Sequence, residues 1–132
     1  MTSINADEHP HLYRAIRDEK WIKVRRLAFR LRKANEVRQA ETDISLILST
    51  DNCTKSVCGS GLVNYCGGEF VLDTRSTLAV SATKGWEVDQ DAPNHARIIG
   101  LPLHGSPKQL INDAALALAE LITDFQPRPT TD

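Results

Sequence analysis

"SPKQLINDAALALAELITDF", residues 106–125, is the stretch of this sequence that decides the fold class. Its apolar side chains recur at i, i+3, i+4 and i+7, which is the spacing of one side of an α-helix. Ser106 suits an N-cap, Pro107 suits the first helical position, and Gln109 completes a capping box three residues after the cap. We therefore expect a long helix that begins at Ser106, extends to Phe125 and packs one side on a core.

Segments upstream of this helix have the composition of β-strands. "TDISLILST" (42–50) alternates apolar and polar residues between turn formers. Three further segments are predicted as strands on the same grounds: "GLVNYC" (61–66), "STLAVSAT" (76–83) and "HARIIGLPL" (95–103). "EFVLD" (69–73) fits either a strand or a short helical turn.

The N-terminal part of the chain is less clear. A proline followed by helical spacing predicts a short helix over 10–21. "VRRLAFRLRK" (24–33) fits a helical stripe, and it equally fits a strand in which Leu27, Phe29 and Leu31 alternate with arginines. The residues alone leave both interpretations open.

The order of these elements predicts an α+β fold. We expect a single domain over 9–125, with an antiparallel or mixed sheet of about four to five strands packed against the long C-terminal helix, plus a short N-terminal helix. A chain of 132 residues with 41% hydrophobic residues is in the size range of one core. Residues 1–8 and 126–132 are expected to be disordered tails.

Cellular location is predicted from what the sequence lacks. No apolar run reaches the roughly 18 residues needed to cross a bilayer, and the first residues do not form a secretory signal. We therefore expect a cytoplasmic protein without membrane contact. In that reducing compartment the three cysteines are expected to be thiols.

Charge is distributed unevenly along the chain. Residues 14–38 hold ten Lys and Arg against three acids, a net charge of +7, whereas the rest of the chain has a net charge of −8. Such asymmetry is typical of a surface that meets phosphate or an acidic partner, and equally of a solvated face beside an acidic half of the same domain.

Several short motifs resemble those of a group of small bacterial proteins of no established activity. They are "LYRAI" (12–16), "AFRLRK" (28–33), an acidic residue before "ISLIL" (44–48), and "PNHARIIGLP" (93–102) ahead of the terminal helix. The resemblance implies that "AFRLR" is a strand, with Leu27, Phe29 and Leu31 inward. Arg26, Arg30 and Arg32 then form a basic ridge on the other side.

"DNCTKSVCGSGLVNYCGGEF" (51–70) contains all three cysteines and four of the seven glycines. A zinc site would use Cys53, Cys58, Cys66 and His95, but a second pair of closely spaced ligands is missing. The glycines also lack the Lys-Ser/Thr that closes a phosphate-binding loop. We therefore expect a turn with buried cysteines, and no bound metal.

Two catalytic interpretations remain as alternatives. Cys58 would act as a nucleophile with His95 as its base, oriented by Asp89 or Asp91. His95 equally fits a side chain that only satisfies loop carbonyls. Arg14 is similar, in outline, to the arginine that grips NAD in ADP-ribosyltransferase-like domains, although no Ser-x-Ser or Glu-x-Glu element accompanies it.

The interpretation that we favour is a binding or accessory module without a cofactor. Its arginine-rich surface would engage nucleic acid or an acidic protein, including a second copy of the chain in a homodimer. Whether the protein is also an enzyme stays open. Eight residues are expected to form the binding surface: Arg14, Arg17, Arg25, Arg26, Arg30, Arg32, Lys33 and His95.

Overall fold

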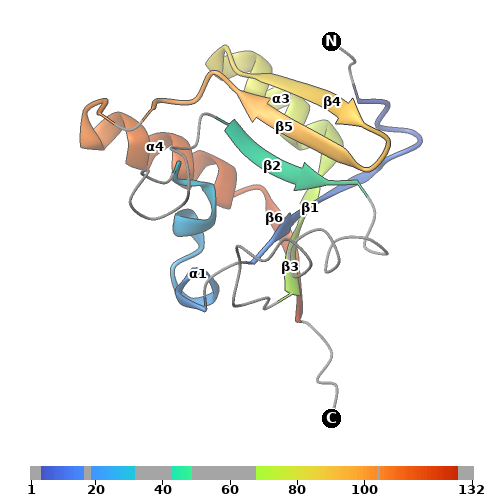
Figure 1. Ribbon diagram of the computed structural model, residues 1–132, viewed down its shortest axis with the longest axis horizontal. Coiled ribbons are helices and arrows are strands. Elements are labelled where there is room, and N and C mark those ends of the chain that lie inside the picture. Colours follow the sequence, from blue (N-terminus) through green and yellow to red (C-terminus); the bar gives the residue numbers. More distant parts are fainter. Residues whose placement is uncertain (1–3, 17–18, 32–42, 49–67, 104, 128–132) are drawn as a thin grey trace.

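Six β-strands pair antiparallel in a single sheet in this computed structural model, which describes residues 4–16, 19–31, 43–48, 68–103 and 105–127 (Figure 1). The sheet order is β4-β5-β2-β1-β3-β6, so β4 and β6 are the edge strands among the described residues. In chain order the strands are β1 (His11–Ala15), β2 (Asp43–Ile47), β3 (Gly68–Asp73), β4 (Glu87–Ala92), β5 (His95–Ile99) and β6 (Ile122–Pro127). The expected α+β class is confirmed, with six described strands rather than four or five.

Helices cover the inner face of this sheet. The described part of the chain contains α1 (Lys20–Lys23), the 3-10 helix η1 (Arg25–Phe29), α3 (Thr74–Lys84) and α4 (Lys108–Ala119). In Figure 1, α3 lies behind β4 and β5, and α4 packs against η1. The core between the helices and the sheet includes fully or almost fully buried side chains from four strands, η1 and α4: Leu12, Phe29, Leu46, Phe70, Ile98 and Leu118. None of the described helices is long and apolar enough to cross a membrane.

The expected helix over 10–21 is wrong, because residues 11–15 form the central strand β1. Leu12 and Ile16 are four positions apart, which suits both a helical side and an alternating strand. Pairing with β2 on one side and β3 on the other supplies backbone hydrogen bonds that decide between the two. Of the described residues between 10 and 21, those that are helical belong to α1, a single turn around the buried Trp21.

The strand that the resemblance implied for "AFRLR" (28–32) is wrong at Ala28 and Phe29. Residues 25–29 form η1, and the backbone becomes extended at Arg30. Ala28, which should have pointed outward in the strand, is fully buried beside Phe29. The alternation of apolar and basic side chains therefore does not hold, and no pleated basic ridge forms over the residues that the structure describes.

α3 replaces the strand expected over 76–83. Its N-cap, Asp73, accepts hydrogen bonds from the backbone N–H and hydroxyl of Ser76, both at 2.9 Å. Gly85 ends the helix in the left-handed conformation, with φ of 77°. The helix buries Thr74, Thr77 and Ser81 rather than an apolar stripe, so the sequence did not show helical periodicity.

The C-terminal helix is confirmed but is shorter than expected. α4 begins at Lys108, after an N-cap at Pro107 that makes no side-chain capping bond, so the capping box at Ser106 is wrong. The helix ends at Ala119, and Ile122 to Pro127 form β6 on the edge of β3. Phe125 packs on Phe70, with ring centroids 5.7 Å apart.

The remaining expectations divide between confirmed and untested ones. β2 and β5 confirm the strands expected within 42–50 and 95–103. For 69–73, where a strand and a helical turn were both open, the structure shows the strand β3. The strand expected over 61–66 and the cysteine-rich turn lie outside the described residues. Within the expected N-terminal tail, Ile4 packs in the core.

Candidate functional site

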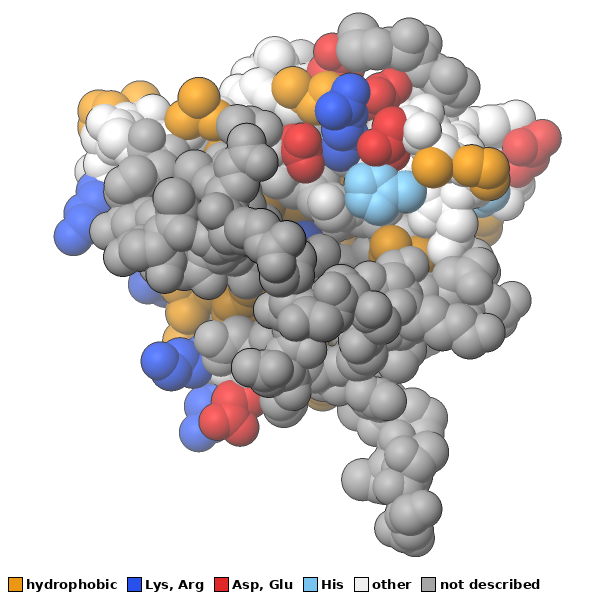
Figure 2. All heavy atoms as spheres, viewed as in Figure 1, with side chains coloured by type: hydrophobic (Ala, Val, Ile, Leu, Met, Phe, Trp, Pro, Cys, Tyr) orange, Lys and Arg blue, Asp and Glu red, His pale blue; other side chains and the backbone are white. Residues whose placement is uncertain are grey.

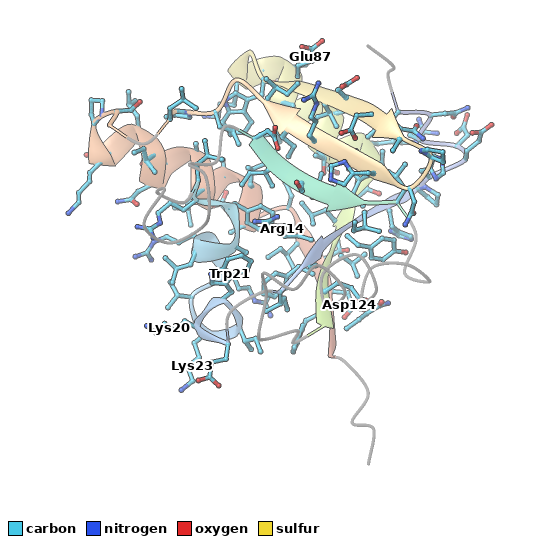
Figure 3. All side chains as sticks on the ribbon, in the orientation of Figure 1. Arg14, Lys20, Trp21, Lys23, Glu87 and Asp124 are labelled. Carbon is cyan, nitrogen blue, oxygen red and sulfur yellow. The ribbon has the colours of Figure 1, made fainter. Side chains whose placement is uncertain are left out.

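Arg14 lies in the core rather than on a binding surface. Its side chain is 1% exposed, and it projects from β1 toward η1. Nε donates a hydrogen bond of 2.7 Å to the carbonyl of Ala28, and Nη1 donates one of 3.0 Å to the carbonyl of Ser45. The guanidinium also lies 5.2 Å from the ring centroid of Trp21. Both side chains are labelled in Figure 3. These contacts tie η1 and α1 to β1 and β2.

Four cationic side chains are exposed together on α1 and η1. Lys20 and Lys23 project from α1, and Arg25 and Arg26 begin η1. We call these four residues the α1–η1 basic surface. In Figure 3 the two lysines point away from the sheet, and in Figure 2 basic side chains gather at this lower left corner of the molecule.

Apolar anchors explain why these cations face outward. Trp21 and Phe29 are 5% and 2% exposed, and Ile22 and Leu27 pack against the core. Two short helices that bury one side each must present their remaining side chains to solvent. The apolar residues of this segment suit both a helical and an alternating period, and the structure buries the adjacent side chains of Ala28 and Phe29, which an alternating strand would not do.

The electrostatics of this surface are strongly positive. Among residues 19–31 the only acid is Glu19, against five Lys and Arg. Lys23, Arg25 and Arg26 form no ion pair with a carboxylate of the described residues. The guanidinium of Arg25 lies 5.5 Å from the ring centroid of Phe70. This cation–π contact holds the Arg25 side chain against β3.

A second group of charged side chains lies on the outer face of the sheet, over β4 and β5. Nε of Arg97 donates a 3.2 Å hydrogen bond to the carboxylate of Asp89. Nδ1 of His95 lies 2.6 Å from the carboxylate of Asp91. Figure 2 shows acidic, basic and histidine side chains together in this region. Of the two carboxylates expected to orient His95, the structure shows Asp91 in contact with it.

The pKa of the Asp91 carboxyl reflects this pairing. Partial burial acts to raise the pKa, but the hydrogen bond and charge of His95, together with the charge of Arg97, outweigh it and hold the pKa below its usual value. Asp91 is therefore the ionised partner of the pair at neutral pH.

The structure brings together only part of the expected binding surface. Arg25 and Arg26 are adjacent and exposed, Arg30 is half-buried, and Arg14 is buried. His95 lies on the outer face of the sheet, on a strand that does not belong to the α1–η1 basic surface. Arg17, Arg32, Lys33 and Cys58 lie outside the described residues.

Sequence reasoning did not single out Lys20, Lys23 or Arg97. The lysines three positions apart were a usable signal, because i and i+3 share one side of a helix. Arg97 follows His95 by two positions in a predicted strand, so the shared face of these two residues was also a usable signal. Their aspartate partners could not be found, because β4 itself was not expected.

Metal chemistry finds no support in the described residues, where no three His, Cys, Asp or Glu side chains are grouped to hold an ion.

Comparison of the chain with protein-family models, curated proteins and solved structures finds no match.

Proposed function

We propose that the protein is a small binding module that engages a phosphate-bearing partner through the α1–η1 basic surface. The observation that supports this most directly is the exposure of Lys20, Lys23, Arg25 and Arg26 on two consecutive short helices. Each cation that neutralises a phosphate releases condensed counterions, which favours binding without reading the base sequence.

The aromatic residues of this region argue against base recognition. Trp21 and Phe29 are the aromatic side chains of α1 and η1, and both are buried in the core. Single-stranded bases need exposed rings on which to stack. The surface therefore suits a phosphate backbone better than splayed bases, and we place a duplex nucleic acid ahead of an acidic protein.

The test is binding to a fluorescent DNA duplex at several salt concentrations. If all four cations contact phosphates, the slope of log K against log salt should be about −3.6, at about −0.9 per contact. The double variant R25Q/R26Q should reduce that slope by about 1.8 and weaken binding at low salt. Its fold should be intact by circular dichroism, because both side chains are exposed.

A matched control is the double variant K84Q/K108Q, which removes the same number of positive charges. Lys84 and Lys108 are exposed at the end of α3 and the start of α4. We expect its slope and affinity to equal those of the parent. Equal losses from both double variants would mean that net charge alone binds DNA, and would refute the proposal.

Polyglutamate of matched charge separates the two partner classes. Weaker binding of polyglutamate than of duplex DNA supports the phosphate-bearing partner. If polyglutamate binds as tightly as duplex DNA or tighter, and R25Q/R26Q abolishes this binding, the partner is an acidic protein. That result would overturn the choice of nucleic acid.

A further inference from the structure

Two ion pairs of similar construction stand side by side on the hairpin of β4 and β5. His95 and Arg97 are two residues apart on β5 and therefore share the outer face of the sheet. Each is held by an aspartate of β4: Asp91 for His95 and Asp89 for Arg97. In each pair one nitrogen of the His95 or Arg97 side chain contacts a carboxylate, and its other nitrogens are left for a further contact.

The pairing fixes which nitrogen of His95 accepts a proton. An ionised carboxylate only accepts hydrogen bonds, so the 2.6 Å contact requires that Nδ1 carry the proton. In the neutral ring, Nε2 then presents its lone pair. Such a carboxylate also stabilises the imidazolium that forms when Nε2 takes a proton.

A bulge in β4 produces this contact. Gln90 pairs with Ala96 and Ala92 pairs with His95, which leaves Asp91 as an extra residue in the strand. A bulge redirects the side chain of the inserted residue and occurs often beside functional sites. Asp89 and Arg97 lie directly opposite each other in the regular part of the β4–β5 pairing, so their contact needs no bulge.

Arg97 retains donors for an oxygen atom. Its Nε donates a hydrogen bond to Asp89, and the side chain is 38% exposed. Its two Nη groups form no hydrogen bond or ion pair with the described residues. A guanidinium carries five N–H donors, so four remain on Nη1 and Nη2. These donors suit an oxyanion that develops beside His95.

We propose that His95, Arg97, Asp91 and Asp89 form a general-base site for hydrolysis of a neutral ester. Nε2 of His95 removes a proton from a water molecule while the water oxygen bonds to the carbonyl carbon. The carbonyl electron pair moves to its oxygen, which Nη of Arg97 stabilises. Collapse of this tetrahedral intermediate expels the alcohol oxygen, and the imidazolium returns the proton to it.

The spacing of the strand fits this step. Two residues along β5 separate the side chains by about 7 Å. That separation can be bridged along a bent path. The water lies about 2.8 Å from Nε2, the attack distance is about 3 Å, and the oxyanion lies about 2.8 Å from Nη. Charge selects the substrate, because the carboxylates of this face, Asp43, Glu87, Asp89 and Asp91, repel an anionic ester.

The experiment measures hydrolysis of p-nitrophenyl acetate by the full chain. We expect His95→Gln to lower the protein-dependent rate by about 100-fold, the lower limit for general-base catalysis. Asp91→Asn should give an intermediate rate and should shift the ¹⁵N signals of His95 away from the Nδ1–H tautomer. A lower rate in D₂O should accompany the parent activity, because a proton moves in the rate-limiting step.

His11→Gln is the matched control, because it removes another exposed imidazole, on β1, that no aspartate holds within hydrogen-bonding distance among the described residues. Its rate should equal that of the parent. Equal rates for the parent and the His95→Gln variant, or a parent His95 with the proton on Nε2, would overturn the proposal. These outcomes do not depend on DNA binding by the α1–η1 basic surface.

Discussion

A guanidinium in a protein core has to find hydrogen-bond acceptors, because its desolvation is otherwise strongly unfavourable. Arg14 finds them in the carbonyls of Ala28 and Ser45 and stacks on Trp21. Arginine is mostly exposed in proteins, so the sequence alone gave no reason to place this one inside. Its expected roles, a residue of the binding surface or an NAD contact, both assumed an accessible side chain.

Arg14→Met tests the structural role of this side chain. Methionine fills similar space but leaves the carbonyls of Ala28 and Ser45 without their donors. At about 1–3 kcal/mol for each of the two unsatisfied carbonyls, the free energy of unfolding should fall by about 2–6 kcal/mol in urea titrations. The exposed Arg26→Met should stay within about 0.5 kcal/mol of the parent. Equal stability of Arg14→Met and parent would contradict this role.

Glu69 should make stability depend on pH. Burial raises the pKa of its carboxyl above the usual value of 4.5. Because the pKa of Glu69 is higher in the folded than in the unfolded state, its contribution to folding stability is fully present below the unfolded-state pKa. That contribution is lost as pH rises through the folded-state pKa. Glu69→Gln should therefore be more stable than the parent at about pH 8, with the difference shrinking toward about pH 4.

Urea midpoints across this pH range provide the measurement. Glu120→Gln, at an exposed position after α4, controls for the loss of one negative charge. A stability gain for Glu69→Gln that grows toward acid pH would show that the sign of the pKa shift is wrong.

At the scale of elements, the sequence correctly predicted the helices and strands whose apolar periodicity has only one interpretation. The alternation in β2 and the helical stripe in α4 are of this kind. β1 was missed because Leu12 and Ile16 satisfy two periods, and α3 because it buries threonines and a serine. β4 and β6 were missed because edge strands need bury only part of their side chains, and so lack a clear apolar pattern.

Gly85→Ala should destabilise the end of α3. Gly85 has φ of 77°, and an added Cβ would meet no atom within 4 Å, so the cost is that of the left-handed backbone alone. That cost is about 1–2 kcal/mol, which corresponds to a fall in Tm of about 3–8 °C. Gly85→Asn should lose less, because asparagine tolerates this conformation. Thermal unfolding in which alanine and asparagine behave alike would count against this explanation.

At the scale of the whole molecule, the charge asymmetry read from the sequence corresponds to separate regions in space. The α1–η1 basic surface lies at a corner of the molecule, whereas carboxylates line the outer face over β4 and β5 (Figure 2). Composition predicted a basic surface, but not its helical geometry. The pairing of Asp91 with His95 depends on a bulge, which no residue pattern indicated.

Removal of β6 should prevent the sheet from forming properly. β6 covers the edge of β3, and Phe125 packs on the fully buried Phe70. A chain that stops after Glu120 exposes both the apolar strand and its unpaired backbone groups, which favours association between chains. We expect it to elute as large aggregates in size-exclusion chromatography, with reduced β-signal in circular dichroism. A folded monomer would show that β6 is dispensable.

The central position of β1 has a consequence for biosynthesis. Among the described strands, β1 is translated before its neighbours β2 and β3, and the strand beyond β3 is the last of them. A nascent chain on the ribosome therefore displays Leu12 and Ile16 before these partner strands exist to cover them. Protection by a ribosome-associated chaperone would matter most for this segment.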